Sequence, residues 1–299
     1  MDDQGFGKNA VKIADVDSYD RRASDFEELT VRFSSRLAAR MLQLASVRST
    51  DSLLDVGTGT GLVAIMAAEQ CDRVVAIDHS AGMLAEARAS ADRAGLAGRI
   101  SFDAMDAEAL DLGSGNFDAI LSLFVVRHLP NPVAAIREMQ RVLKPGGRVV
   151  ISAGARPDVL TLQGFKSAVG IASDRLMEKA GRRALSPTCL RRFLTEEGVP
   201  PSCHHAAHSS SGNVDLMLNK AGFSSVRRHW WSERHELTPE LFWEVQAVFD
   251  SEARAALSML GPDKIDDFRH RFVEQMRDMV QRGATLIYRT GVFIYSAQK

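Results

Sequence analysis

Three glycines at alternate positions, Gly57, Gly59 and Gly61, constrain this chain more than any other feature of its sequence. A short apolar run at residues 53–56 leads into them, and residues 62–68 after them have the composition of a helix. A strand, a tight glycine turn and a helix start let the backbone approach a ligand closely and offer it the first N–H groups of the helix. The spacing G-x-G-x-G differs from the G-x-G-x-x-G of a dinucleotide site, so we expect a ligand of another class.

Further segments follow the turn in an alternating order of strand and helix. Residues 73–78 form a second apolar run ending in Asp78, and a carboxylate at such a strand end can hold the two hydroxyls of a ribose. Ser80 is then a candidate N-cap of the next helix. Residues 102–107 (FDAMDA), 117–123 (FDAILSL) and 141–147 (RVLKPGG) complete the set. Taken together, these segments resemble the class I S-adenosylmethionine-dependent methyltransferases, and within them the quinone-biosynthesis and natural-product group.

The resemblance implies a site for S-adenosylmethionine, with S-adenosylhomocysteine as the product. It places Gly57 and Gly59 beside the methionine part of the cofactor and Asp78 on the ribose hydroxyls. Asp106 would meet the adenine amino group, and the backbone of Leu123 the methionine ammonium. The other cofactor-side positions that it implies are Tyr19, Asp55, Thr58, Gly61, His79, Met83, Met105, Ala107 and His128. For Tyr19 and Met83, packing of a helix on the sheet is an open alternative.

Between residues 52 and 152, strands and helices alternate five times. Apolar strands separated by helices are typical of a parallel sheet covered on both faces, and right-handed crossovers bring the strand ends to one edge. We expect an α/β fold, Rossmann-like and doubly wound, with a mostly parallel sheet and helical lid insertions. The resemblance adds that the sheet has seven strands and that the last is antiparallel.

The expected division of the chain follows from these segments. It comprises an N-terminal arm and lid helix (1–48), the S-adenosylmethionine-binding core (49–156), a helical lid insertion (157–212), a core helix and sixth strand (213–237), a second helical lid insertion (238–282) and a final core strand (283–299). The apolar residues of the insertions indicate a fairly hydrophobic acceptor; they are Leu162, Phe165, Phe242, Trp243 and Phe249. The alternative is that the insertions only add packing.

The composition of the chain limits the classes of partner that we expect it to bind. The 299 residues carry a net charge of -1, so no global basic field draws the chain to nucleic acid or to an anionic membrane. No signal peptide and no apolar run of the ~20 residues that a membrane helix needs are evident. Three cysteines without a regular framework suggest a reducing compartment. We expect a cytoplasmic protein with a small-molecule acceptor, no nucleic-acid partner and no membrane insertion, and a homodimer is compatible with the sequence.

Two groups of histidines are candidates for other chemistry. Cys203, His204, His205 and His208 lie close together, but they lack a second cysteine pair and stand among small polar residues, which favours a solvated loop over a metal site. We therefore expect no metal.

His128 is the candidate general base, since it follows the fourth strand where relatives have the active-site cleft. Relatives often carry two adjacent histidines there, and Arg127 replaces the first, which favours a packing role for His128. His229 and His235 are further candidates.

The predicted function is transfer of a methyl group to a small, fairly hydrophobic metabolite such as a polyketide, quinone or similar natural-product intermediate, with oxygen favoured over carbon or nitrogen. The alternative is a member of the same fold that binds the cofactor and catalyses a cyclisation or rearrangement without methyl transfer. Methyltransferases of base amino groups place Asn/Asp-Pro-Pro-aromatic after the fourth strand, whereas residues 122–125 here read SLFV. The glycine spacing disfavours a nicotinamide oxidoreductase.

Overall fold

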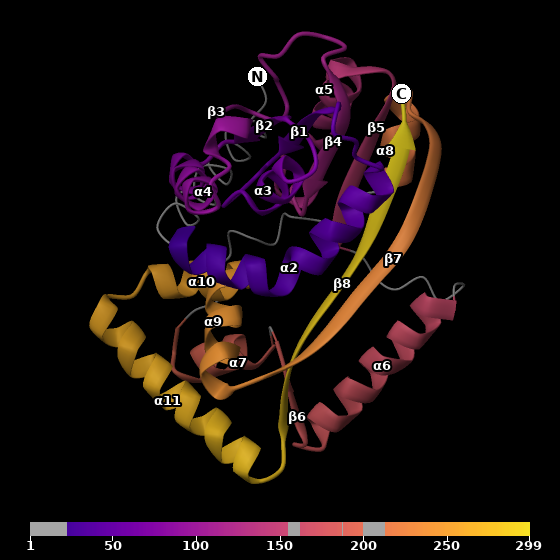
Figure 1. Ribbon diagram of the computed structural model, residues 1–299. Helices are drawn as coiled ribbons and strands as arrows, with labels where there is room; N and C mark the ends of the chain where they lie inside the picture. The colour runs from indigo at the N-terminus through magenta and orange to yellow at the C-terminus, as the bar shows by residue number, and fades with distance from the viewer. Residues whose placement is uncertain (1–22, 155–161, 187, 200–212) are drawn as a thin grey trace, which may run out of the picture. The chain divides into compact units, whose positions relative to one another are not determined.

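The computed structural model describes residues 23–154, 162–186, 188–199 and 213–299 (Figure 1). The chain divides into two compact units. The first comprises Met1–Ala155, His208–His229 and Val292–Lys299, and the second comprises Arg156–Ala207 and Trp230–Gly291. Strands β7 (Ser224–Leu237) and β8 (Thr285–Gln298) contribute residues to both units.

The first unit is built on a sheet with the strand order β3-β2-β1-β4-β5-β8, to which β7 is added beside β8. The leading strands are β1 (Ser52–Val56), β2 (Arg73–Asp78), β3 (Ile100–Ala104), β4 (Phe117–Leu123) and β5 (Leu143–Gly154). These five are parallel, whereas β8 runs antiparallel to β5. Chain order reverses at β1 and β4, and ligands of such sheets bind outside the carboxyl ends of the strands at that point. The Rossmann-like fold class predicted from the sequence is confirmed.

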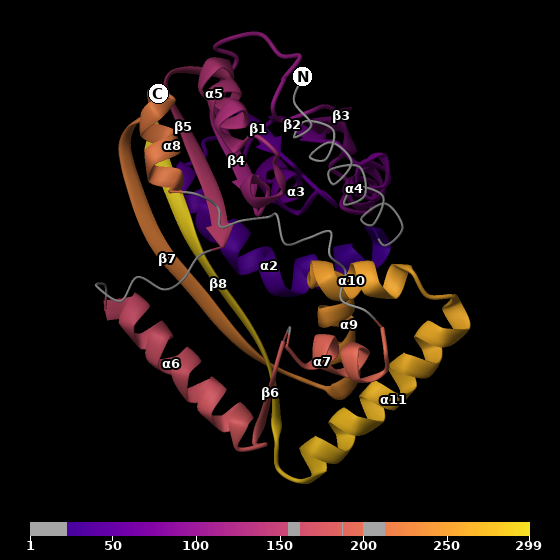
Figure 2. The ribbon, with the colours of Figure 1, turned by 180° about the vertical axis from the view of Figure 1, so that it is seen from behind.

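Helices of the first unit alternate with these strands. They are α2 (Ala23–Ala45), α3 (Leu62–Ala68), α4 (Ala81–Arg93), α5 (Pro132–Val142) and α8 (Val214–Lys220), with the single turns η1 (Ala97–Arg99) and η2 (Val126–His128). Helices α2, α3 and α4 contact one another, whereas α5 contacts α8 (Figures 1 and 2). Ser80 caps α4 by accepting from Met83 N, and Asn131 caps α5 by accepting from Ala134 N. Both caps satisfy N–H groups that would otherwise lack a partner, and the cap at Ser80 confirms the one predicted from the sequence.

Gly146 and Gly147 lie within strand β5. This strand begins at Leu143, which pairs with Phe117. The register then shifts, so that Arg148 pairs with Ala119 and the intervening residues form a bulge. Lys144 Nζ donates to Asp118 Oδ2 at 2.7 Å, and this contact joins the bulge to β4.

The second unit is mainly helical. Its elements are α6 (Leu162–Lys179), β6 (Arg183–Leu185), α7 (Thr188–Glu196), α9 (Pro239–Phe249), α10 (Ser251–Ser258) and α11 (Pro262–Gln281), with parts of β7 and β8. Strand β6 pairs in parallel with β8, from Arg183 opposite Thr285 to Leu185 opposite Ile287. This strand makes the sheet eight-stranded instead of the seven expected. Its three residues carry too little pattern to be recognised as a strand in the sequence.

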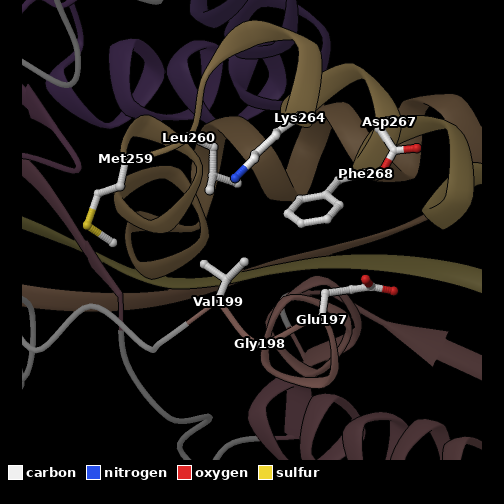
Figure 3. Close-up of a pocket in the computed structure, with 8 residues that line it drawn as sticks. All are labelled: Glu197, Gly198, Val199, Met259, Leu260, Lys264, Asp267 and Phe268. Atoms are coloured by element: carbon white, nitrogen blue, oxygen red, sulfur yellow. The ribbon is translucent and has the colours of Figure 1, made fainter.

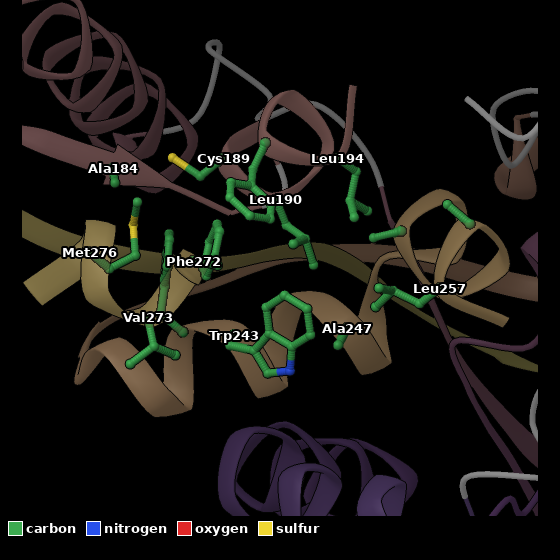
Figure 4. Packing of buried hydrophobic residues seen from close by; sticks show 14 of the residues in the cluster. Ala184, Cys189, Leu190, Leu194, Trp243, Ala247, Leu257, Phe272, Val273 and Met276 are labelled. Atoms are coloured by element: carbon green, nitrogen blue, oxygen red, sulfur yellow. The ribbon is translucent and has the colours of Figure 1, made fainter. Parts of the chain in front are cut away.

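An apolar cluster packs helices α7, α9, α10 and α11 of the second unit together (Figure 4). Phe242, Trp243 and Phe272 lie at its centre, and the rings of Phe242 and Phe272 stack with centroids 6.2 Å apart. Phe242 and Trp243 are fully buried against α7 and α11, so the expectation that they indicate a hydrophobic acceptor is wrong. They form the hydrophobic core of this unit, which is where large apolar side chains are most often found.

Candidate functional site

The glycine turn between β1 and α3 adopts a backbone that favours glycine at all three positions. The φ angles of Gly57, Gly59 and Gly61 are 71°, 55° and 91°, in the left-handed region that costs other residues about 1–2 kcal/mol. Gly57 N and Thr58 N both donate to Ile77 O at 2.9 Å, which ties the turn to the end of β2. The turn therefore lies where the ends of two neighbouring parallel strands meet.

The surroundings of the three glycines differ. A Cβ built on Gly57 would lie 2.2 Å from Val125 Cγ2, and one on Gly61 would lie 3.1 Å from Ala87 Cβ. Both glycines are therefore needed for close packing inside the protein. A Cβ on Gly59 would meet no atom of the described residues within 4 Å. The open side of the turn is thus at Gly59, where backbone is accessible to a ligand.

Asp55, the acid of β1, lies beneath the turn. Its Oδ2 accepts from Thr58 Oγ1 at 2.7 Å, while its buried Oδ1 has no hydrogen-bond partner among the described residues. Burial raises the pKa of Asp55 to about 7; the Thr58 hydrogen bond opposes this rise, and the charge of Asp78 adds to it. An orphaned carboxylate oxygen in this position favours a cation or a hydrogen-bond donor beside the turn.

Asp78 joins the turn from the end of β2. Its Oδ2 accepts from Gly59 N at 2.8 Å, and its Oδ1 accepts from Ser80 N at 3.0 Å. Burial raises the pKa of Asp78, and the hydrogen bonds from backbone N–H groups oppose the rise. Each carboxylate oxygen has about two acceptor sites, so one on each oxygen remains for a further donor. That arrangement fits a pair of neighbouring hydroxyls.

The end of β3 lies next to β2. Met105 N donates to Asp78 O at 3.0 Å, and Asp106 Oδ1 accepts from Glu108 N at 3.0 Å. Asp106 thus caps a turn as well as lying near the site, and Ala107 after it is buried. Met83 is buried on α4, which fits the core alternative as well as the cofactor role, and His79 is exposed.

The end of β4 holds a feature that sequence reasoning missed. Phe124, which follows Leu123, has a φ of 63°, and its N–H donates to Ser152 Oγ on β5 at 2.9 Å. This backbone turns Val125 onto Gly57. Nothing in the sequence marks Phe124, because a positive φ is expected at glycine or asparagine and not at an aromatic residue. His128 follows in η2, with its N–H donating to Val125 O.

Other predicted residues fall elsewhere. Tyr19, Cys203, His204, His205 and His208 lie outside the described residues. His229 belongs to the first unit, where burial and the charges of Arg40 and Arg227 lower its pKa. His235 belongs to the second unit. Among the residues that the structure describes, no group of three His, Cys, Asp or Glu side chains is placed to hold a metal ion.

A cavity of about 440 Å³ opens in the second unit (Figure 3). Its wall is apolar at Val199, Met259, Leu260 and Phe268 and charged at Glu197, Lys264 and Asp267. Among the described residues, none of those predicted for the cofactor lines it.

Comparisons with known proteins agree with the geometry. Residues 54–151 match the methyltransferase domain family. The ubiquinone/menaquinone biosynthesis C-methyltransferase UbiE of Pseudomonas putida is 31% identical over 191 residues, which are 63% of this chain and 71% of that relative. The fold is similar to that of a candidate methyltransferase from Bacillus halodurans, with a TM-score of 0.54, 19% identity and coverage of 88% of this chain and 98% of that one. It is also similar to the 4+2-cyclase SpnF, with a TM-score of 0.50, 19% identity and coverage of 90% and 81%. At these identities the two solved structures show the fold alone.

Proposed function

The chain belongs to the class I S-adenosylmethionine-dependent methyltransferases, in the group of the quinone-biosynthesis enzymes, and we propose that its acceptor is a small, fairly hydrophobic metabolite of the quinone or polyketide type. The observation that supports a cofactor site is the turn at Gly59, whose open side lies beside the carboxylates of Asp55 and Asp78. The apolar character of the acceptor is supported by the named activity of the Pseudomonas putida relative.

The residues present fit S-adenosylmethionine. The orphaned Oδ1 of Asp55 suits a cationic group, and the remaining acceptor sites of Asp78 suit the ribose hydroxyls. The open side of Gly59 leaves room for the methionine part, and Asp106 and the backbone of Leu123 are proposed for the adenine and the ammonium. When bound, the cofactor supplies an electrophilic methyl group on a positively charged sulfur.

The chain's own contribution is positioning. Holding the cofactor against the sheet edge and the acceptor in line with the methyl group can lower the barrier by ~7–11 kcal/mol, because proximity and orientation are supplied in advance. The two carboxylates also favour the cationic cofactor over its neutral product, which assists release after transfer. The assignment of His128 as the base stays a prediction, as does the lid role of residues 157–212 and 238–282.

The acceptor atom is the finer part of the proposal. The sequence favoured oxygen, whereas the named activity of the relative is C-methylation, so we propose carbon with oxygen as the competing outcome. Incubation with S-adenosylmethionine carrying a labelled methyl group, followed by NMR of the product, separates a carbon-bound from an oxygen-bound methyl. Conversion of the acceptor without uptake of label would instead establish a cyclisation or rearrangement.

Binding of the cofactor is tested by titration calorimetry with S-adenosylmethionine, S-adenosylhomocysteine and NAD. Asp78→Ala removes two acceptor groups, and we expect the affinity for both sulfur nucleosides to fall about a hundredfold, since each hydrogen bond to a charged group contributes ~1.5–3 kcal/mol. Asp103→Ala is the matched control, because Asp103 is an exposed acid on the neighbouring strand β3. Equal affinity in the Asp78 and Asp103 variants would refute the ribose assignment, and binding of NAD alone would refute the proposed cofactor.

A further inference from the structure

Helix α6 of the second unit exposes its apolar side chains. Leu162, Phe165, Val169 and Leu176 are 73%, 55%, 53% and 68% exposed. They follow one another at intervals of three, four and seven residues, so they form one stripe along the whole helix. Ala172 is also exposed and fills the gap in this stripe. We call these five residues the α6 stripe.

The opposite face of α6 is polar and packs inside the unit. Ser167 Oγ accepts from Trp230 Nε1 at 2.8 Å, and Asp174 pairs with Arg183 and Arg289. Gly170 lets Arg289 approach the helix, since a Cβ there would lie 3.3 Å from Arg289 Nη2. Helix α6 also contacts β6 beside it (Figure 2). The usual arrangement of a surface helix is thus reversed, with polar groups inward and apolar groups outward.

Basic side chains flank the α6 stripe. Lys166, Arg175 and Lys179 are exposed, and within the described ranges none of them forms an ion pair. With about 3.6 residues per turn, Lys166 lies on one side of the stripe and Arg175 and Lys179 on the other. The two acids of α6 do not lie beside these cations, because the buried Asp174 pairs with the half-buried Arg183 and Arg289, and Glu178 lies on the inward half of the helix.

We propose that α6 docks on an anionic phospholipid surface. An apolar stripe bordered by lysine and arginine is the pattern of a helix that lies in a membrane interface, with its apolar face in the acyl boundary and its cations at the head groups. A second copy of the chain is the competing occupant. It would bring a second set of the same three cations against the first, without acids to pair with them. Charge complementarity therefore favours the lipid surface.

This mode of docking needs no spanning helix. Within the parts of the chain that are described, no helix is both long and apolar enough to cross a bilayer. The sequence predicted no membrane insertion and no global basic field, and a docked α6 requires neither. A local arrangement of three cations along one helix supplies the attraction, which a net charge of -1 does not reveal.

The test is flotation of the full chain with vesicles of mixed phosphatidylcholine and phosphatidylglycerol, against vesicles of phosphatidylcholine alone. The variant Phe165→Ser/Leu176→Ser weakens the apolar contact, and we expect its vesicle affinity to fall at least about tenfold. Met259→Ser/Val280→Ser is the matched control, because both residues are exposed apolar side chains of the same unit outside α6. Lys166→Gln/Lys179→Gln should lower the affinity for the anionic vesicles about tenfold or more.

Thermal unfolding of each variant shows whether it is folded. If the variant Phe165→Ser/Leu176→Ser does not fold, the variant Lys166→Gln/Lys179→Gln still tests the proposal. Absence of wild-type binding to anionic vesicles would overturn the proposal, as would equal binding by the stripe and control pairs. Sedimentation velocity distinguishes the competing occupant. A dimer that the stripe variant dissolves, together with no vesicle binding, would assign the α6 stripe to contact between two copies.

Discussion

Gly57 and Gly59 lie two residues apart in the same turn, but Gly57 packs closely against Val125, whereas Gly59 lies on the open side of the turn. Both have positive φ, so alanine at either position costs ~1–2 kcal/mol in backbone conformation. At Gly57 the added Cβ would also meet Val125 Cγ2 at 2.2 Å, and overpacking of this kind costs typically ~1–3 kcal/mol. Gly57→Ala should therefore lower the free energy of unfolding by ~2–5 kcal/mol, and Gly59→Ala by only ~1–2 kcal/mol.

Relative to the stability that each variant loses, Gly59→Ala should lower the affinity for S-adenosylmethionine more than Gly57→Ala does. The Cβ of Gly59→Ala enters the open space proposed for the cofactor, so we expect at least about a tenfold loss of affinity from one unfavourable contact of ~1.4 kcal/mol or more. Urea denaturation gives the stability of each variant, and calorimetry gives the affinity. Equal destabilisation by the two alanines, or unchanged cofactor affinity in Gly59→Ala, would refute the reasoning.

The steric part of the Gly57 effect can be isolated with Val125. In the double variant Gly57→Ala/Val125→Ala the overlap is removed while the backbone cost remains. We expect the two substitutions to be non-additive, with the second recovering ~1–3 kcal/mol, as is usual for residues in direct contact. Additive losses would mean that Val125 does not limit the space at Gly57.

Three further outcomes follow from buried polar groups and a helix cap. The pKa of Asp55 is about 7 in the folded chain and has its ordinary value in the unfolded chain, so protonation of Asp55 stabilises the fold fully below about pH 4, and this contribution is lost as the pH rises to 7. Across that window, urea denaturation should show that the stability of Asp55→Asn rises relative to wild type by up to ~4 kcal/mol. Parallel pH profiles of the two proteins would contradict this. Asp174→Asn leaves Arg183 and Arg289 without their carboxylate and should cost ~3 kcal/mol by the same method, whereas a loss below ~1 kcal/mol would show that solvent screens the pair. Asn131→Ala removes the cap of α5 and should lower the melting temperature through a loss of ~1 kcal/mol, with an unchanged melt as the contrary result.

The local sequence pattern was enough to predict much of the fold and part of the candidate site. The glycine turn, the cap at Ser80 and the alternation of strands and helices depend on residues close together in the chain. Parallel strands with right-handed crossovers have their ends at one edge, which is why Asp55 and Asp78 could be placed near the turn before any distance was known. The hydrogen bond from Gly59 N to Asp78 bears out that nearness across 19 positions of sequence.

Tertiary structure alone decided which side of each apolar pattern faces inward. Phe242 and Trp243 look like lining of an acceptor site in the sequence, yet they form the core of the second unit. Helix α6 has an apolar stripe that periodicity reveals, but periodicity is the same whether a stripe faces a core or the solvent. The left-handed backbone of Phe124 likewise depends on Ser152, which is distant in sequence and accepts its N–H. The sequence determined the elements and the chemistry at their ends, whereas burial and strain depend on partners that only the folded chain brings together.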